Sequence, residues 1–133
     1  MRLIDTNVIV YTVGSAHPLK EASERILSDI TAGTLAANLD AEALQEVLHL
    51  YSSRGERRKG FRTIGHLLML FPNPFPIGRE EIERARDLMM EHSFLVCRDA
   101  IHAAVVQTHD LEGIITADKV FDRIKGLKRF DVK

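Results

Sequence analysis

Short apolar runs alternate along this chain with longer stretches whose apolar residues recur at helical spacing. The short runs predict five β-strands, at residues 2–5, 35–39, 75–77, 114–116 and 129–132. The longer stretches predict six α-helices, over residues 6–13, 18–31, 40–53, 56–70, 80–92 and 98–109, followed by a short helix at 118–124. Strands that alternate with helices are typical of a parallel sheet with helices on both faces, so the pattern predicts an α/β fold.

Residues at the ends of these segments support the boundaries. Gly33 follows the second predicted helix, and Asp40 stands at the N-cap of the third. Glu80 and Glu81 fall in the first turn of the fifth helix, where negative charge suits the helix dipole. Prolines at 72, 74 and 76 mark the loop before it.

Three acidic residues are expected at the carboxyl edge of the predicted sheet. Asp5 ends the first strand, and Asp118 follows the fourth after one intervening residue. Asp99 lies in the first turn of the helix that precedes the fourth strand, and such a helix begins at that same edge. Because ligands of open α/β sheets bind beyond the carboxyl ends of the strands, these side chains are candidates for a binding site.

Glu46 is the candidate for a fourth acid. It lies about six residues into the third helix, roughly 9 Å along the axis from an end at the same edge. The apolar arc of this helix comprises Ala43, Leu44, Val47, Leu48, Leu50 and Tyr51. On a helical wheel Glu46 falls about 40° beyond Leu50, whereas Glu42 falls about 80° beyond it, so Glu46 can lean over the sheet edge.

Carboxylates gathered in one place repel one another, and a hard divalent cation relieves that repulsion. A set of oxygen ligands without a cysteine or histidine cluster suits Mg²⁺ or Mn²⁺ and not Zn²⁺. Taken singly, each acid has a simpler interpretation: Asp5 and Asp118 as helix N-caps, Asp99 as a first-turn acid, and Glu46 as a solvated side chain. The convergence of all four on one edge favours a metal site.

Composition is that of one ordinary globular domain, expected to span residues 1–133. Apolar residues make up 45% of the chain and charged residues 28%, and the net charge of −1 gives no overall sign of a nucleic-acid partner. The single cysteine, Cys97, excludes a disulfide framework. The early Asp5 argues against a signal peptide, and no apolar run approaches the roughly 20 residues of a membrane span. A cytoplasmic location fits these features.

Four motifs together resemble the PIN domain, and most closely the VapC-type toxins of bacterial and archaeal toxin–antitoxin pairs. In chain order they are Asp5-Thr6-Asn7, Gln45-Glu46-Val47-Leu48, Arg98-Asp99-Ala100-Ile101-His102-Ala103-Ala104 and Thr116-Ala117-Asp118-Lys119-Val120-Phe121-Asp122. The resemblance spans nearly the whole chain in the correct order. It implies a three-layer α/β/α fold with a central parallel sheet of four to five strands and the activity of a metal-dependent endoribonuclease.

The resemblance also implies roles for individual residues. Asp5, Glu46, Asp99 and Asp118 would form the acidic quartet that holds Mg²⁺ or Mn²⁺, with Asp5 and Asp99 as direct ligands of one firmly held ion. A second ion or substrate-dependent site would lie toward Glu46 and Asp118. The quartet would be joined by Thr116, which helps to place a water, by Asn7, which orients Asp5, and by the additional acid Asp122. Cys97 departs from the pattern, where a serine or threonine cap is common. Relatives commonly form homodimers and bind an antitoxin protein, so RNA, an antitoxin and a second copy are the expected partners.

Two basic groups could hold an RNA backbone, and the sequence does not rank them. The first comprises Arg54, Arg57, Arg58, Lys59 and Arg62, and the second comprises Lys119, Arg123, Lys125, Lys128 and Arg129. Solvated helix faces are the simpler interpretation of either group. His102, one helical turn beyond Asp99, is interpreted as a structural histidine.

Three other functions remain to be weighed against a toxin ribonuclease. The same nuclease could serve RNA processing or decay without a toxin role. A phosphotransfer protein with Asp5 as phospho-acceptor is disfavoured, because Asp5-Thr6-Asn7 lacks the second early acid of such motifs. An RNA-binding module without activity is disfavoured by the presence of all four carboxylates.

Overall fold

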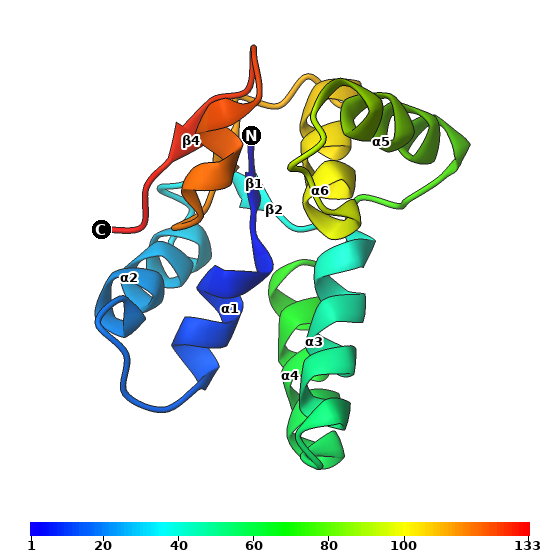
Figure 1. Cartoon of the computed structure of the whole chain (residues 1–133). Coiled ribbons are helices and arrows are strands. Elements are labelled where there is room, and N and C mark those ends of the chain that lie inside the picture. Colours follow the sequence, from blue (N-terminus) through cyan, green and yellow to red (C-terminus); the bar gives the residue numbers. More distant parts are fainter.

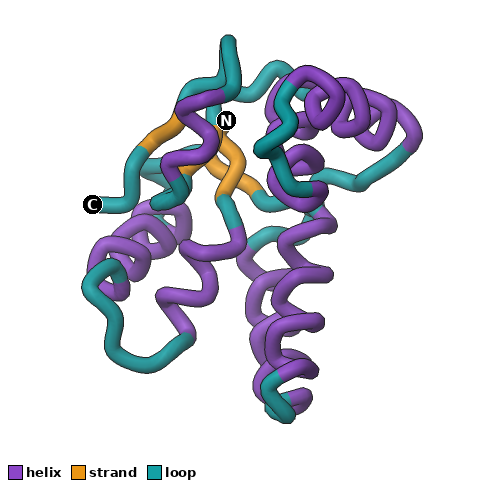
Figure 2. The backbone as a smooth tube through the Cα atoms, viewed as in Figure 1, coloured by secondary structure: helices purple, strands orange, loops and turns teal.

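A four-stranded parallel sheet lies at the centre of the computed structural model, which describes residues 1–133 (Figures 1 and 2). The strands are β1 (Arg2–Ile4), β2 (Ala37–Asn38), β3 (Ile114–Ile115) and β4 (Arg129–Phe130), in the spatial order β2-β1-β3-β4. All three strand pairs are parallel. The predicted α/β class is confirmed.

Six α-helices connect and cover these strands. They are α1 (Thr6–Val13), α2 (Lys20–Thr31), α3 (Ala41–Ser53), α4 (Arg57–Leu70), α5 (Arg79–Glu91) and α6 (Cys97–Thr108), and a 3₁₀ helix, η1 (Lys119–Arg123), follows β3. All six predicted helices are confirmed to within two residues at their ends. Asp40 caps α3 as predicted, since its carboxylate accepts a hydrogen bond from the amide of Ala43 at 2.9 Å.

The prediction of a strand at residues 75–77 was wrong. Only Phe75 pairs, through a single parallel bridge with Asp40 beyond the end of β2. Its amide donates to the carbonyl of Leu39 and its carbonyl accepts from Ala41. Pro74 and Pro76 on either side have no N–H group to donate, so the pairing cannot extend.

Alternating side chains on the strands divide the interior into two cores. Leu3 and Ile114 point to one face and pack with the apolar sides of α5 and α6. Ile4 and Ile115 point to the other face and pack with α1, α2, α3 and α4. This alternation follows from the two-residue period of a strand and confirms the predicted three layers.

The α3–α4 hairpin extends well beyond the end of the sheet (Figure 1). Its two helices lie against each other, and a Cβ atom at Gly60 would come within 3.1 Å of the Cβ of Tyr51, so glycine allows their close approach. None of the helices in the fold has both the length and the apolar character that a bilayer span requires.

Candidate metal centre

One cavity of about 510 Å³ brings together the four acids that the sequence singled out. It lies against the end of β1, the start of α6 and the inner side of α3. Its lining residues are Asp5, Thr6, Asn7, Val10, Glu46, His49, Leu50, Ser53, Arg54, Arg98, Asp99 and Asp118. Only two of these are hydrophobic, so the cavity suits a charged ligand. Glu42 does not line it, which agrees with the choice of Glu46.

Asp5 is held rigidly at the junction of β1 and α1. One carboxylate oxygen accepts a 2.7 Å hydrogen bond from the amide of Thr6, so Asp5 is also the N-cap of α1. The other oxygen accepts a 2.6 Å bond from the hydroxyl of Thr116. Burial raises the pKa of Asp5, and the positive charge of His102 opposes that rise. Asp5 can thus cap α1 and still present its carboxylate to the cavity, so the N-cap role does not exclude a role as metal ligand.

Thr116 is completely buried and its hydroxyl is fully used within the protein. It donates to Asp5 and accepts from the side-chain amide of Asn7 at 3.1 Å and from the backbone amide of Asp118 at 3.0 Å. A hydroxyl has one donor and two acceptor sites, so none remains for a water. The geometry therefore does not support the predicted role of Thr116 in placing a water. Thr116 orients Asp5, and Asn7 acts on Asp5 only through Thr116.

Asp99 differs from the other acids because its carboxylate makes no hydrogen bond or ion pair with the rest of the protein. It stands in the first turn of α6, as predicted. Burial, followed by the negative charges of Asp5 and Asp118, raises the pKa of Asp99 to about 6. Asp118 uses one oxygen to cap η1 through the amide of Val120. Asp122 forms a pair with Arg129 and does not line the cavity.

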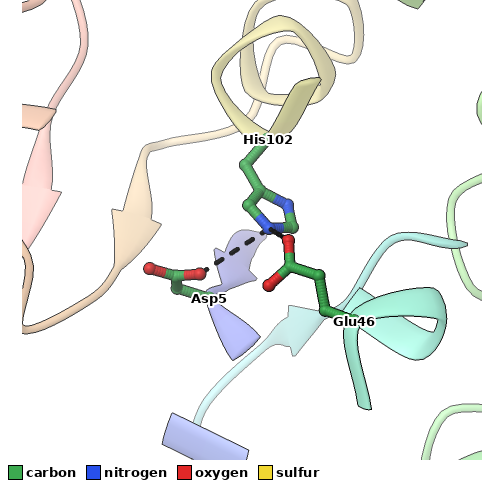
Figure 3. A group of neighbouring side chains, drawn as sticks. All are labelled: Asp5, Glu46 and His102. Atoms are coloured by element: carbon green, nitrogen blue, oxygen red, sulfur yellow. Dashed lines mark hydrogen bonds and ion pairs between the residues drawn. The ribbon is translucent and has the colours of Figure 1, made fainter. Parts of the chain in front are cut away.

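Glu46 is connected to a buried histidine that links two carboxylates. Figure 3 shows Asp5, Glu46 and His102 directed toward one another from different elements. The ring of His102 is fully buried, with Nδ1 2.7 Å from an oxygen of Asp40 and Nε2 3.0 Å from an oxygen of Glu46. Nε2 also lies 3.6 Å from Asp5. His102, on α6, thus contacts both Asp40 at the start of α3 and Glu46 in the middle of α3.

Both ring nitrogens of His102 face carboxylate oxygens, an arrangement that favours the positively charged ring. Burial alone would lower its pKa, but the hydrogen bonds that the ring donates to Asp40 and Glu46 raise the pKa of His102 well above its usual value. Burial alone would raise the pKa of Glu46, and the contact with His102 lowers it below the usual range. Ligand atoms of Asp5, Glu46 and His102 lie within 4.8 Å of one another, a spacing that a metal ion could use. A doubly protonated ring has no lone pair for a metal, so His102 fits better as a fixed cation than as a ligand.

The sequence reasoning missed this connection. His102 was interpreted as a structural histidine and Asp40 only as a helix cap. The available signal was a single histidine inside the apolar run from Ala100 to Val106, since a buried imidazole needs polar partners.

Comparisons with known proteins agree with this geometry. The sequence profile of the PIN domain matches residues 2–127. Ribonuclease VapC13 of Mycobacterium tuberculosis is 34% identical over 129 residues, which cover 97% of this chain and 98% of the relative.

Two solved structures share the fold. The Sarcin-Ricin loop cleaving toxin VapC20 of M. tuberculosis superposes with a TM-score of 0.78 at 14% identity, covering 96% of this chain and 97% of the VapC20 chain. A chain of a toxin–antitoxin complex from Klebsiella pneumoniae superposes with a TM-score of 0.70 at 24% identity, covering 96% of both chains.

Proposed function

The chain belongs to the PIN domain family, and from that premise we propose that it is a Mg²⁺- or Mn²⁺-dependent endoribonuclease, the toxin of a VapBC-type toxin–antitoxin pair. Ribonuclease VapC13, which the chain matches over nearly its whole length, is a named VapC ribonuclease. The observation that carries the proposal is the meeting of four carboxylates in one polar cavity. We further propose that residues 1–133 form a single PIN domain that acts in the cytoplasm as a homodimer.

The residues at the site fit a divalent cation bound through oxygen. Asp99 offers both carboxylate oxygens, and its raised pKa is the sign of negative charge that a cation would offset. Asp5 is fixed by two hydrogen bonds, so its position is set before any ion arrives. Mg²⁺ and Mn²⁺ suit such a site better than Zn²⁺, which prefers nitrogen and sulfur ligands.

Charge coupling divides the acids into two groups that share Asp5. In addition to burial, the negative charges of Asp5 and Asp118 raise the pKa of Asp99. Apart from burial, the pKa of Asp5 is instead lowered by the charge of His102 and raised by the charge of Glu46. This supports a principal ion on Asp5, Asp99 and Asp118. A second ion, or one that arrives with substrate, would lie toward Glu46. The grouping differs from the expectation that placed Asp118 with Glu46.

In this scheme the protein acts by position and charge. A divalent cation supplies Lewis acidity, which acidifies water and offsets the charge of the phosphate. Thr116 and Asn7 keep Asp5 in one orientation, and His102 keeps Glu46 in one orientation. The ring charge of His102 and the guanidinium of Arg98 reduce the repulsion between the carboxylates and an approaching RNA.

Cleavage of a panel of RNAs is expected to need Mg²⁺ or Mn²⁺ and to stop when EDTA is added. Fragments resolved by denaturing electrophoresis would give the rates and the cut positions. The Asp5→Asn variant keeps the shape of the side chain and is expected to lose cleavage by about a thousandfold, an effect of several kcal/mol. Cleavage that survives in Asp5→Asn, or that ignores EDTA, would rule out the proposed site.

The toxin role predicts that production of the protein arrests bacterial growth. Co-production of the cognate antitoxin is expected to restore growth, and the Asp5→Asn variant should be harmless when made at the same level. Growth curves with immunoblots of protein level would test this. Normal growth alongside metal-dependent cleavage in vitro would point instead to RNA processing or decay.

A further inference from the structure

The cavity that holds the carboxylates continues along α3, away from the sheet. Glu46, His49, Leu50 and Ser53 line it from one face of that helix, at the spacing of three and four residues that brings side chains into a row. Arg54 closes the row at the C-terminal end of α3. Eight residues separate it from Glu46, or roughly 12 Å at 1.5 Å per residue. The cavity therefore has four carboxylates and one cation, Arg98, near the sheet, and a second cation without any carboxylate at the tip of α3.

Arg54 is an unpaired cation within this cavity. Its guanidinium makes no hydrogen bond, and no carboxylate lies within 4.0 Å of it, although four acids line the same space. The hydroxyl of Ser53 already donates to the carbonyl of His49, at 2.8 Å. The donors left free at this end are thus the guanidinium of Arg54 and the ring of His49.

The second basic group, near the C-terminus, is differently placed. None of its members lines the cavity. Arg129 pairs with Asp122 and Asp131, the guanidinium of Arg123 lies 3.7 Å from the ring centre of Phe94, and Lys128 lies over the ring of Phe130. The structure therefore ranks the two groups, which the sequence left equal, and selects Arg54 from the first.

We propose that Arg54, assisted by His49, is a subsite for a backbone phosphate of single-stranded RNA. This phosphate lies a few nucleotides from the one that is cleaved at the carboxylates, so the inference rests on the proposed function. An arginine fork suits a phosphate through two parallel hydrogen bonds. An acidic protein segment fits less well, because only Val10 and Leu50 offer apolar contacts along the cavity.

A simpler explanation assigns Arg54 to the helix dipole, since cations stabilise a helix C-terminus. That role would affect the melting temperature and not the binding of RNA. The two explanations are separated by measuring both quantities in the same variants. Arg58 provides a matched control because it is an exposed arginine four residues away that does not line the cavity.

The test is fluorescence anisotropy of a labelled oligouridylate RNA, titrated with intact protein in Ca²⁺ over a series of salt concentrations. Arg54→Gln is expected to bind about tenfold more weakly than wild type, the effect of one charged hydrogen-bonded contact. The slope of log affinity against log salt should become shallower by about 0.7, the value for one phosphate on a single strand. Arg58→Gln should match wild type in both quantities.

Hydrolysis of bis(4-nitrophenyl) phosphate with Mn²⁺ separates this inference from the proposed function. The small ester carries a single phosphate and no neighbouring nucleotides, so its hydrolysis by the wild-type protein tests the carboxylate site without the subsite. Equal RNA affinity and slope in Arg54→Gln and wild type would overturn the subsite, as would equal losses in Arg54→Gln and Arg58→Gln, or no binding of RNA by wild type. Failure of the wild-type protein to hydrolyse either ester or RNA would instead overturn the nuclease.

Discussion

Replacing Asp99 by asparagine is expected to abolish metal-dependent cleavage and, at the same time, to make the metal-free protein more stable. Asp99 has no hydrogen-bonding partner and faces Asp5 and Asp118, so its charge at neutral pH costs the folded state free energy. Asparagine removes that charge with little change in shape. If Asp99 is a direct metal ligand, as proposed, its loss should lower the cleavage rate by about a thousandfold.

The pH dependence of stability follows from the direction of the shift. The folded pKa of Asp99, about 6, lies above the ordinary value of 3.8, so the folded protein binds more protons than the unfolded chain between these values. Stability from this group is therefore complete at low pH and is lost as pH rises through about 6. After allowance for solvent screening the loss is of order 1–2 kcal/mol.

Thermal melts of the metal-free protein at several pH values would measure this difference. Between pH 4 and 7, Asp99→Asn should lose less stability than wild type, and Mn²⁺ should raise the melting temperature of wild type only. Asp29→Asn, a change of the same size at an exposed position of α2, is the matched control. An Asp99→Asn protein that is stabilised by Mn²⁺ as strongly as wild type would contradict the assignment of this ligand.

Replacing His102 by leucine is expected to destabilise the protein by about 3–5 kcal/mol, the cost of leaving one side of a buried ion pair without its partner. Asp40 is fully buried and Glu46 is partly buried, and both would lose the hydrogen bonds of 2.7 and 3.0 Å that His102 provides. For a domain of this size the melting temperature should fall by roughly 10 °C or more. Chemical denaturation followed by circular dichroism would give the free energy.

A second variant separates the charge from the packing. Asp40→Asn keeps an N-cap for α3, because asparagine caps a helix as well as aspartate does, and it removes the buried charge. Combined with His102→Leu it should recover about 1–2 kcal/mol of the loss, the coupling expected between residues in direct contact. Strictly additive losses in this double-mutant cycle would mean that the link between Asp40 and His102 contributes no more than packing.

The contact between His102 and Glu46 can be tested through the affinity of the protein for Mn²⁺. His102→Gln keeps a donor toward Glu46 and should therefore fold better than His102→Leu. If His102 positions Glu46, the leucine variant should bind Mn²⁺ more weakly than wild type, by tens of fold, and the glutamine variant should lose less affinity, as expected when a group that orients a ligand is removed or kept. Calorimetric titration with Mn²⁺ measures this without any need for substrate.

The local features of the fold could be predicted from sequence because each depends on neighbouring residues. Helix α3 begins at Asp40 through a cap, and α1 begins at Asp5 for the same reason. The meeting of Asp5, Asp99 and Asp118 could also be predicted, since helix direction fixes which ends of the elements share an edge. Their role as metal ligands stays a prediction.

The features that the sequence did not reveal depend on contacts between distant segments. The contact between Asp40 and His102 requires the start of α3 to face the middle of α6, and no local pattern specifies that distance. The strand predicted at residues 75–77 does not form. Its neighbour β2 ends before it, and Pro74 and Pro76 have no backbone N–H groups to extend the pairing beyond Phe75. The saturation of the Thr116 hydroxyl likewise depends on Asp5 and Asn7, which lie at the other end of the sequence, and on the nearby amide of Asp118.

The parallel order β2-β1-β3-β4 has a consequence for the moment during synthesis at which the site is assembled. Asp5 is translated well before Asp99 and Asp118, its neighbours in the cavity. A growing chain on the ribosome therefore carries no assembled site until the segment with Asp118 has been made. If the protein is the toxin proposed above, an antitoxin made before it has the whole of that interval in which to accumulate.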